Sequence, residues 1–212
     1  MERFSVALPQ MQFDEEVTVV WVALDGQYVG NICISDSIKE DAKESVERLR
    51  ALGMVTAMLT GDKLGSARAV AEKTEIQQVY AQLLPENKLE HLQKIRKDFG
   101  PVMFVGDGIN DAPVLAGSDV GAAMGSGADA AMEAADVVFM TSKVSAIPKA
   151  LEIARKTRAI AWQNVVFALA VKAAVMGLGL LGWASMWAAV FADSGVAMLC
   201  VLNAVRMLRK CK

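Results

Sequence analysis

Residues 105–113 read Val-Gly-Asp-Gly-Ile-Asn-Asp-Ala-Pro and directly follow the apolar run 102–104. This order predicts a buried strand that turns into a helix, with Asp107 and Asp111 at the turn. Mg²⁺ usually takes one or two carboxylates together with phosphate oxygens and water, so two acids four residues apart suit it. The stretch therefore predicts a magnesium site, with Asp107 and Asp111 as ligands, where a strand ends.

The other residues of this turn leave a simpler interpretation open. Gly106 and Gly108 keep the backbone open around Asp107, and we assign them, with Asn110, to binding of a phosphorylated cofactor. A glycine-rich turn in which Asn110 or Asp111 only caps the following helix would look similar. The complete nine-residue string favours phosphate chemistry over the plain turn.

Strand-like and helix-like segments alternate on both sides of this stretch. The expected strands are 55–59, 79–80, 102–105, 120–124 and 137–140, and the expected helices are 39–52, 66–73, 86–99, 111–116 and 125–135. Such alternation predicts an α/β fold with a doubly wound parallel sheet, in which ligands bind at the carboxyl ends of the strands. Thr60 and Asp107 lie at such ends, and Lys88 could reach the same edge.

The string Gly-Asp-Gly-Ile-Asn-Asp-Ala-Pro resembles a signature of the P-type ATPases, whose phosphorylation domain belongs to the haloacid dehalogenase superfamily. Residues 58–62, Met-Leu-Thr-Gly-Asp, and residues 84–88, Leu-Pro-Glu-Asn-Lys, resemble two further blocks of that family in the same order. The resemblance implies ATP and Mg²⁺ as cofactors. It makes Thr60, Gly61 and Asp62 catalytic residues, with Thr60 contacting the phosphoryl group, and Lys88 the group that neutralises phosphoryl charge.

The nucleophile of that family, the first Asp of Asp-Lys-Thr-Gly-Thr, has no counterpart in the 212 residues. The chain therefore resembles the C-terminal portion of a pump and is expected to be inactive alone. Asp36 could replace the nucleophile, because it follows an apolar run and precedes Thr60. Its +2 residue is Ile38, however, where an acid or Thr is expected for proton handling.

The C-terminal third is apolar enough to enter a membrane. The stretches at about 160–182 and 185–205 are each interrupted by one charge, Lys172 and Asp193, and each could cross a bilayer core of about 30 Å as a helix. We expect a two-helix transmembrane hairpin in the lipid bilayer. A buried helical hairpin in a soluble core is the alternative interpretation.

Charge changes sign along the chain. Residues 149–212 hold nine Lys or Arg against two acids, whereas residues 1–148 hold thirteen against twenty-two. The basic residues flank both apolar stretches, so the positive-inside rule places both termini in the cytoplasm of a multi-pass protein of the cell membrane. The acidic part argues against nucleic acid as a partner.

The pattern of polar residues in the apolar stretches indicates a transported ion. Asn164, Lys172, Asp193 and the segment 203–206 together resemble the zinc, cadmium and lead branch of the P-type ATPases. The resemblance implies that Asp193 binds a divalent metal ion and that Lys172 is its counter-ion when the site is empty. A salt bridge that only pairs two helices is the alternative, and the copper branch would show Tyr, Met and Ser at these places.

Two other residues could carry chemistry, but simpler roles are expected. Cys200 could approach a metal path, and packing is the favoured role; the three cysteines show no Cys-x-x-Cys spacing and predict no zinc site. His91, the only histidine, is expected on the surface of a helix.

The expected domains are residues 1–35, a β-hairpin remnant of a nucleotide-binding domain; 36–148, a phosphorylation domain; and 149–212, a basic linker helix with the two spans. The predicted function is ATP-driven export of Zn²⁺, Cd²⁺ or Pb²⁺, with the missing N-terminal part of the pump as a possible partner. Alternatives are a non-catalytic membrane protein from a truncated or split gene, and a membrane-tethered phosphatase using Asp36.

Overall fold

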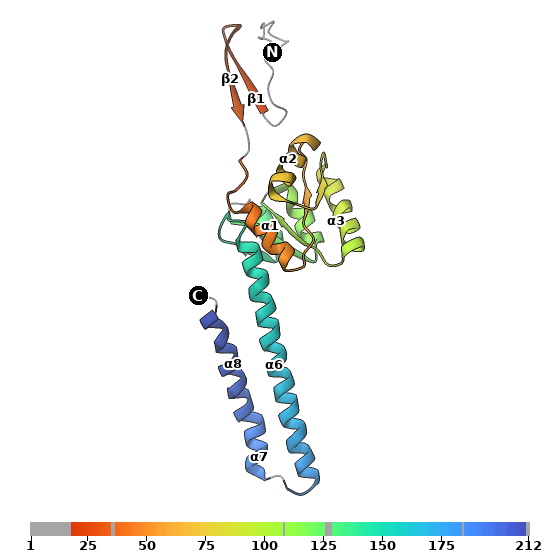
Figure 1. The fold of residues 1–212 in the computed structure, drawn as a ribbon, viewed down its shortest axis with the longest axis vertical. Coiled ribbons are helices and arrows are strands. Elements are labelled where there is room, and N and C mark those ends of the chain that lie inside the picture. The colour runs from red at the N-terminus through yellow and green to blue at the C-terminus, as the bar shows by residue number, and fades with distance from the viewer. Residues whose placement is uncertain (1–17, 35–36, 108, 126–128, 184, 211–212) are drawn as a thin grey trace. The chain divides into compact units, whose positions relative to one another are not determined.

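The computed structural model describes residues 18–34, 37–107, 109–125, 129–183 and 185–210 (Figure 1). Asp36 and Gly108 lie outside the described residues, so the two predictions made for them stay untested. The chain divides into two compact units, Met1–Ala146 and Ile147–Lys212.

The first described elements form the predicted β-hairpin. Strand β1 (Thr18–Leu24) pairs antiparallel with β2 (Gln27–Ile34). Asp25 and Gly26 both have positive φ, 49° and 77°, as the tight two-residue turn of a twisted hairpin requires. The rings of Trp21 and Tyr28 lie 5.6 Å apart and hold the two strands together on one face.

The α/β region carries parallel strands, as predicted, but in two sheets. Strand β3 (Ala57–Leu59) pairs with β4 (Gln78–Tyr80), and β5 (Met103–Gly106), β6 (Val120–Met124) and β7 (Val137–Phe139) pair in that order. The expectation of a single continuous sheet is wrong for the described residues, because β3 and β5 each pair on one side only. Thr60 and Asp107 thus each follow an edge strand.

Helices alternate with these strands, as the apolar spacing predicted. They are α1 (Ala42–Ala51), α2 (Leu64–Thr74), α3 (Pro85–Phe99), the 3₁₀ turn η2 (Ile109–Asp111), α4 (Ala112–Gly117) and α5 (Asp129–Ala134). The core around β6 is built from small and branched side chains, with Leu115, Ala123 and Ala131 buried together. Its packing is close, since a Cβ on Gly121 would lie 2.5 Å from the carbonyl oxygen of Leu115.

Helix α6 (Ala146–Leu180) is one continuous helix of 35 residues. This helix contains most of the expected basic linker helix and most of the first expected span, at about 160–182. Pro148 falls in the first turn, where its missing N–H costs nothing. Among the described residues, α6 is the one helix whose length and composition would let it cross a membrane.

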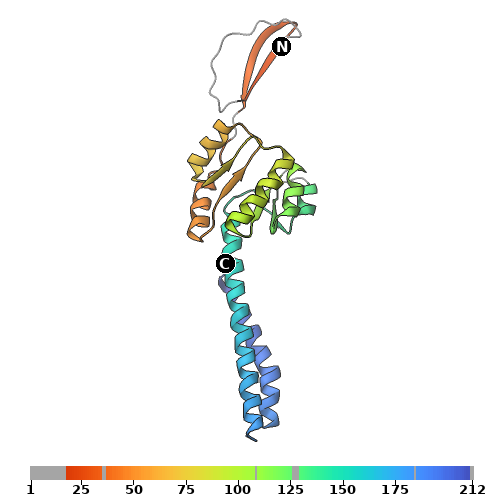
Figure 2. The same cartoon turned by 90° about the vertical axis from the view of Figure 1, so that its right-hand side faces the viewer.

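The predicted second span, 185–205, is helical in three consecutive pieces. These are α7 (Met186–Val190), the π-helical segment η3 (Phe191–Gly195) and α8 (Val196–Lys210). Both views show α8 running alongside α6 (Figures 1 and 2). Asp193 lies in the π-helical segment, a feature that the sequence did not predict.

Candidate functional site

Lys88 and Asp111 form an ion pair at the end of β5. Lys88 projects from the first turns of α3, and its Nζ donates to Oδ1 of Asp111 at 2.8 Å. The two side chains are only 16% and 14% exposed, so solvent screens this pair weakly. The sequence assigned Lys88 to phosphoryl charge and Asp111 to Mg²⁺, and the structure shows the two groups bound to each other.

Gly106, the last residue of β5, makes room for the Asp111 side chain. A Cβ at position 106 would lie 2.9 Å from both Cβ and Oδ2 of Asp111, which is closer than real Cβ atoms approach. Asp107 follows at once and is exposed, as is Asn110. The absence of a side chain at Gly106 therefore lets the Asp111 side chain lie against the end of β5, directly before Asp107.

The Thr60 loop is organised by its own side chains. The Thr60 hydroxyl donates to Oδ2 of Asp62 at 2.6 Å, and the Asp62 N–H donates to the Thr60 hydroxyl oxygen at 3.1 Å. The N–H groups of Gln82 and Leu83 donate to the carbonyl oxygens of Asp62 and Thr60, at 2.9 and 3.0 Å. These bonds fix the loop to the segment that enters α3, the helix that carries Lys88.

Gly61 lies in this hydrogen-bonded loop. A Cβ there would lie 3.4 Å from the carbonyl oxygen of Leu83, a tight but tolerable contact. The candidate site therefore contains two hydrogen-bonded pairs, Thr60 with Asp62 and Lys88 with Asp111. Residues 82–88 connect the two pairs along the chain.

The donor set at the end of β5 fits Mg²⁺. The ion needs one or two carboxylates and takes its other ligands from phosphate and water, and Asp107 offers an exposed carboxylate. No cluster of three or more His, Cys, Asp or Glu side chains is found among the described residues, so a cage made entirely of protein ligands is not indicated there.

In the second unit, Lys172 of α6 meets Asp193 of the π-helical segment. Nζ and Oδ1 are 3.1 Å apart, and the side chains are 55% and 77% exposed. A π-helical turn inside a helix is often found at functional sites. Gly195 allows this turn to close, because a Cβ there would lie 2.7 Å from the ring of Phe191.

Cys200 and His91 both have packing partners. The Cys200 thiol donates to the carbonyl oxygen of Asn164 at 3.7 Å, and the cysteine is half-buried. This contact favours the packing role over a metal role. His91 lies on α3, is half-buried, and has its ring 5.0 Å from that of Tyr80.

Asp41 is a residue that sequence reasoning missed. Its Oδ2 accepts a hydrogen bond from the N–H of Ser145 at 2.9 Å, immediately before α6 begins. This bond and weaker ones from neighbouring groups hold the pKa of the Asp41 carboxyl below its usual value of 3.8. Lys39 adds a bond from Nζ to the carbonyl oxygen of Ser142 at 2.6 Å. The partners are more than a hundred residues apart, so no local pattern signals them.

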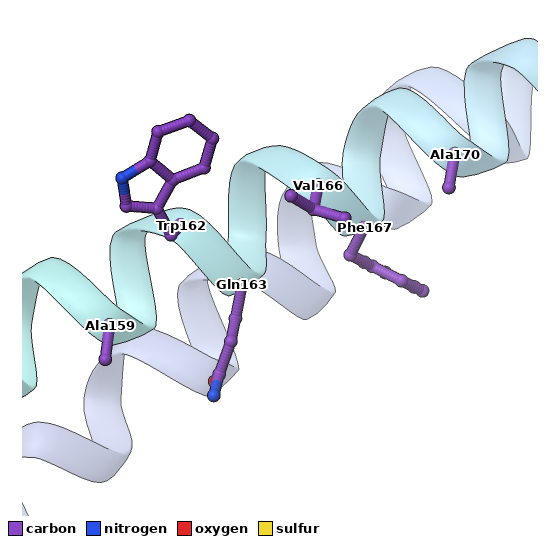
Figure 3. A pocket seen from close by; sticks show the side chains of 6 residues that line it. All are labelled: Ala159, Trp162, Gln163, Val166, Phe167 and Ala170. Atoms are coloured by element: carbon purple, nitrogen blue, oxygen red, sulfur yellow. The ribbon is translucent and has the colours of Figure 1, made fainter.

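An open hollow on α6 contributes no chemistry to either site. It is lined by six side chains of that one helix, with Gln163 as the polar member (Figure 3): Ala159, Trp162, Gln163, Val166, Phe167 and Ala170. A single neutral amide on an apolar surface cannot compensate the charge of a phosphate or a dication.

Comparisons with known proteins show the family of the chain. Residues 4–119 match the family model of haloacid dehalogenase-like hydrolases. The chain is 51% identical to the cadmium, zinc and cobalt-transporting ATPase of Bacillus subtilis (strain 168) over 91% of its own length and 28% of that protein. It is 49% identical to the zinc-transporting ATPase of Synechocystis sp. (strain ATCC 27184 / PCC 6803 / Kazusa) over 91% and 27% of the two chains.

A solved structure is similar over nearly the same extent. The crystal structure of a zinc-transporting PIB-type ATPase in the E2.Pi state superposes with a TM-score of 0.82 and 37% identity, over 91% of this chain and 32% of that one. The chain thus spans between a quarter and a third of the relatives that it matches.

Proposed function

Because the chain belongs to the haloacid dehalogenase-like hydrolases and corresponds to the C-terminal part of cadmium-, zinc- and cobalt-transporting P-type ATPases, we propose that it serves ATP-driven export of a divalent heavy metal ion. Zn²⁺ and Cd²⁺ are the proposed cargo. Pb²⁺ belongs to the same proposal, because the pattern of Asn164, Lys172 and Asp193 resembles the zinc, cadmium and lead branch. The observation that carries the transport proposal is the Lys172–Asp193 pair, with its 3.1 Å separation between two apolar helical segments.

In this proposal the end of β5 and the Thr60 loop stabilise a phosphoryl group. Thr60 donates its hydroxyl to a phosphoryl oxygen, Gly61 and Asp62 hold the loop, and Lys88 supplies a positive charge. Lys88 must leave Asp111 to pair with the phosphoryl group, and this step breaks one ion pair. Gly106, Gly108 and Asn110 line the approach of the phosphate-bearing ligand.

Mg²⁺ would bind Asp107 and Asp111 and neutralise charge on the phosphoryl group and on ATP. Release of Lys88 from Asp111 frees that carboxylate for the metal and the ammonium for the phosphate. The same ion pair thus holds both groups ready while phosphate and metal are absent. Pairing also lowers the cost of keeping two charges in a largely buried place.

The proposal assigns the phosphorylated Asp to the missing N-terminal part of the pump. The 212 residues contain no Asp-Lys-Thr-Gly-Thr string, and the remaining groups only stabilise charge. The sheet edges support this, since β3 and β5 each pair on one side only with the strands that the structure describes, and a further strand could pair with either. We therefore propose residues 36–148 as a phosphorylation domain without its nucleophile, and residues 1–35 as part of a nucleotide-binding domain.

For the second unit we propose a two-helix transmembrane hairpin, with spans near 160–182 and 185–205 and both termini in the cytoplasm of a multi-pass cell-membrane protein. A Lys–Asp pair costs less in hydrocarbon than either charge alone. A divalent ion can displace the ammonium from Asp193, and Lys172 can re-pair with the carboxylate when the metal leaves. The salt bridge is then the resting state of the cargo site.

The transport proposal is tested in a full-length pump that carries these residues. Asp193→Ala should reduce zinc-stimulated ATP hydrolysis to background and remove bound zinc. Lys172→Ala should keep bound zinc but slow turnover, because the empty site loses its counter-charge. Unchanged zinc binding and turnover in Asp193→Ala would leave the pair as a helix-packing contact only.

The phosphoryl chemistry is tested in the same pump. Asp107→Asn should abolish Mg²⁺-dependent phosphoenzyme formation, and the matched control Asp98→Asn, at an exposed position near the end of α3, should not. Full phosphorylation in Asp107→Asn would contradict the magnesium assignment.

A further inference from the structure

A polar cluster joins α6 to α8 at a place away from the Lys172–Asp193 pair. The Nδ2 of Asn164 donates to the carbonyl oxygen of Cys200 at 3.1 Å, and Oδ1 of Asn164 accepts from Nδ2 of Asn203 at 2.8 Å. Arg206 donates to Oδ1 of Asn203 at 2.9 Å. Both amides are therefore bonded through their oxygen and their nitrogen.

The two asparagines lie on the faces by which the helices meet. Less exposed positions recur on α6 every three or four residues: Ile160, Asn164, Ala168, Val171 and Val175. The facing segment has the same spacing: Ala192, Val196, Cys200, Asn203 and Met207. Apart from Cys200, whose thiol donates to the carbonyl oxygen of Asn164, the remaining members of both sets are apolar, so Asn164 and Asn203 supply the side-chain amides of this contact.

From these contacts we infer that Asn164 and Asn203 are positioning residues, which set the register of α6 against α8 so that Lys172 faces Asp193. Hydrogen bonds between membrane helices hold them at a defined alignment, whereas apolar side chains alone tolerate sliding. Asn164 and Lys172 are eight residues apart, about 12 Å along the helix. A slip of one turn, about 5.4 Å, would break the asparagine contact and separate Lys172 from Asp193.

The hydrogen bonds that both amides already make between and along the helices favour a positioning role over a metal-ligand role. Each amide oxygen uses one of its two lone pairs here: that of Asn164 accepts from Asn203, and that of Asn203 accepts from Arg206. The positioning role deepens the proposed transport function and rests on it for its purpose. The helix register itself can be measured without metal or ATP.

The test uses the full 212-residue chain in lipid nanodiscs, in a background of Cys33→Ser, Cys200→Ala and Cys211→Ser. The Cys200 change keeps the backbone carbonyl that Asn164 binds. New cysteines replace Lys172 and Asp193, which removes the salt bridge and leaves the asparagines to hold the register. Oxidative cross-linking between positions 172 and 193 reports the native register. In a second variant, Met176→Cys takes the place of the change at Lys172, and cross-linking between 176 and 193 reports a slip of one turn.

We expect rapid 172–193 cross-linking in this background and about a tenfold slower rate when Asn164→Leu and Asn203→Leu are combined. Each interhelical hydrogen bond shifts such an equilibrium about threefold. Cross-linking between 176 and 193 should rise. The matched control is Gln163→Leu, an amide on the neighbouring position that lines the open hollow (Figure 3) and should leave both rates unchanged.

An unchanged 172–193 rate in the double variant, or an equal loss in Gln163→Leu, would overturn the positioning role. If the double variant loses its helical circular dichroism, Asn203→Ala alone decides, with an expected loss of about threefold. In a full-length pump, Asn164→Leu should lower zinc-dependent kcat while zinc stoichiometry is kept. Loss of bound zinc with normal cross-linking would make Asn164 a ligand and refute the inference. Unchanged zinc binding and turnover in an Asp193→Ala pump would refute the proposed transport role, and the cross-linking result on the helix register would still stand.

Discussion

Separating Lys88 from Asp111 should destabilise the α/β region by an amount that the geometry sets. The pair is joined at 2.8 Å, and both side chains are about 15% exposed. A hydrogen bond between charged groups is worth about 1.5–3 kcal/mol, and the partner left behind becomes an unpaired, largely buried charge. We therefore expect Asp111→Asn and Lys88→Met each to lower the free energy of unfolding by about 2 kcal/mol.

The double variant distinguishes a true interaction from two independent losses. Because removing both charges leaves neither unpaired, the combined loss should fall short of the sum by about 1.5 kcal/mol. Hydrogen exchange of peptides covering residues 103–117 measures this, since a loss of 2 kcal/mol raises the opening equilibrium about thirtyfold.

Arg96 provides the control, because its salt bridge to Asp119 is made by a side chain that is 54% exposed. Arg96→Met should change stability by no more than about 0.5 kcal/mol. A coupling energy below about 0.3 kcal/mol between positions 88 and 111 would refute the view that this pair holds the site together.

Three further outcomes are expected. The Ser145 N–H lowers the pKa of Asp41, so the stabilisation from this carboxylate is present above pH 3.8 and is lost as pH falls through the lower pKa of the folded state. The stability of Asp41→Asn should therefore lack this loss at acid pH, and acid-unfolding curves that superimpose with those of the unaltered chain would contradict this. Gly121→Ala should cost about 1–3 kcal/mol in thermal denaturation, because its Cβ would meet the backbone of Leu115 at 2.5 Å, whereas Gly30→Ala, which meets no atom within 4 Å, should cost much less. The purified chain incubated with labelled ATP and Mg²⁺ should give no acid-stable phosphoprotein, and a labelled band lost in Asp36→Asn would show that a nucleophile had been overlooked.

Local patterns in the sequence determined the kinds of element and the residues that carry chemistry. The turn at Asp25-Gly26, the strand that ends at Gly106 and the helix that begins at Pro85 each follow from neighbouring residues, because φ/ψ preferences and apolar spacing act over a few positions. The position of Asp107 directly after a strand likewise follows from its neighbouring residues. Charge in an apolar stretch likewise marked Lys172 and Asp193 without any knowledge of the fold.

The tertiary structure decided which of these residues meet. Lys88 and Asp111 are 23 residues apart, and Asn164 and Asn203 are 39 apart. Such contacts depend on how helices cross and how strands pair, and local spacing contains neither. The division of the expected sheet into two was decided in the same way. The π-helical turn at Asp193 has a local feature that the sequence patterns did not reveal, because the ring of Phe191 lies where a side chain on Gly195 would stand.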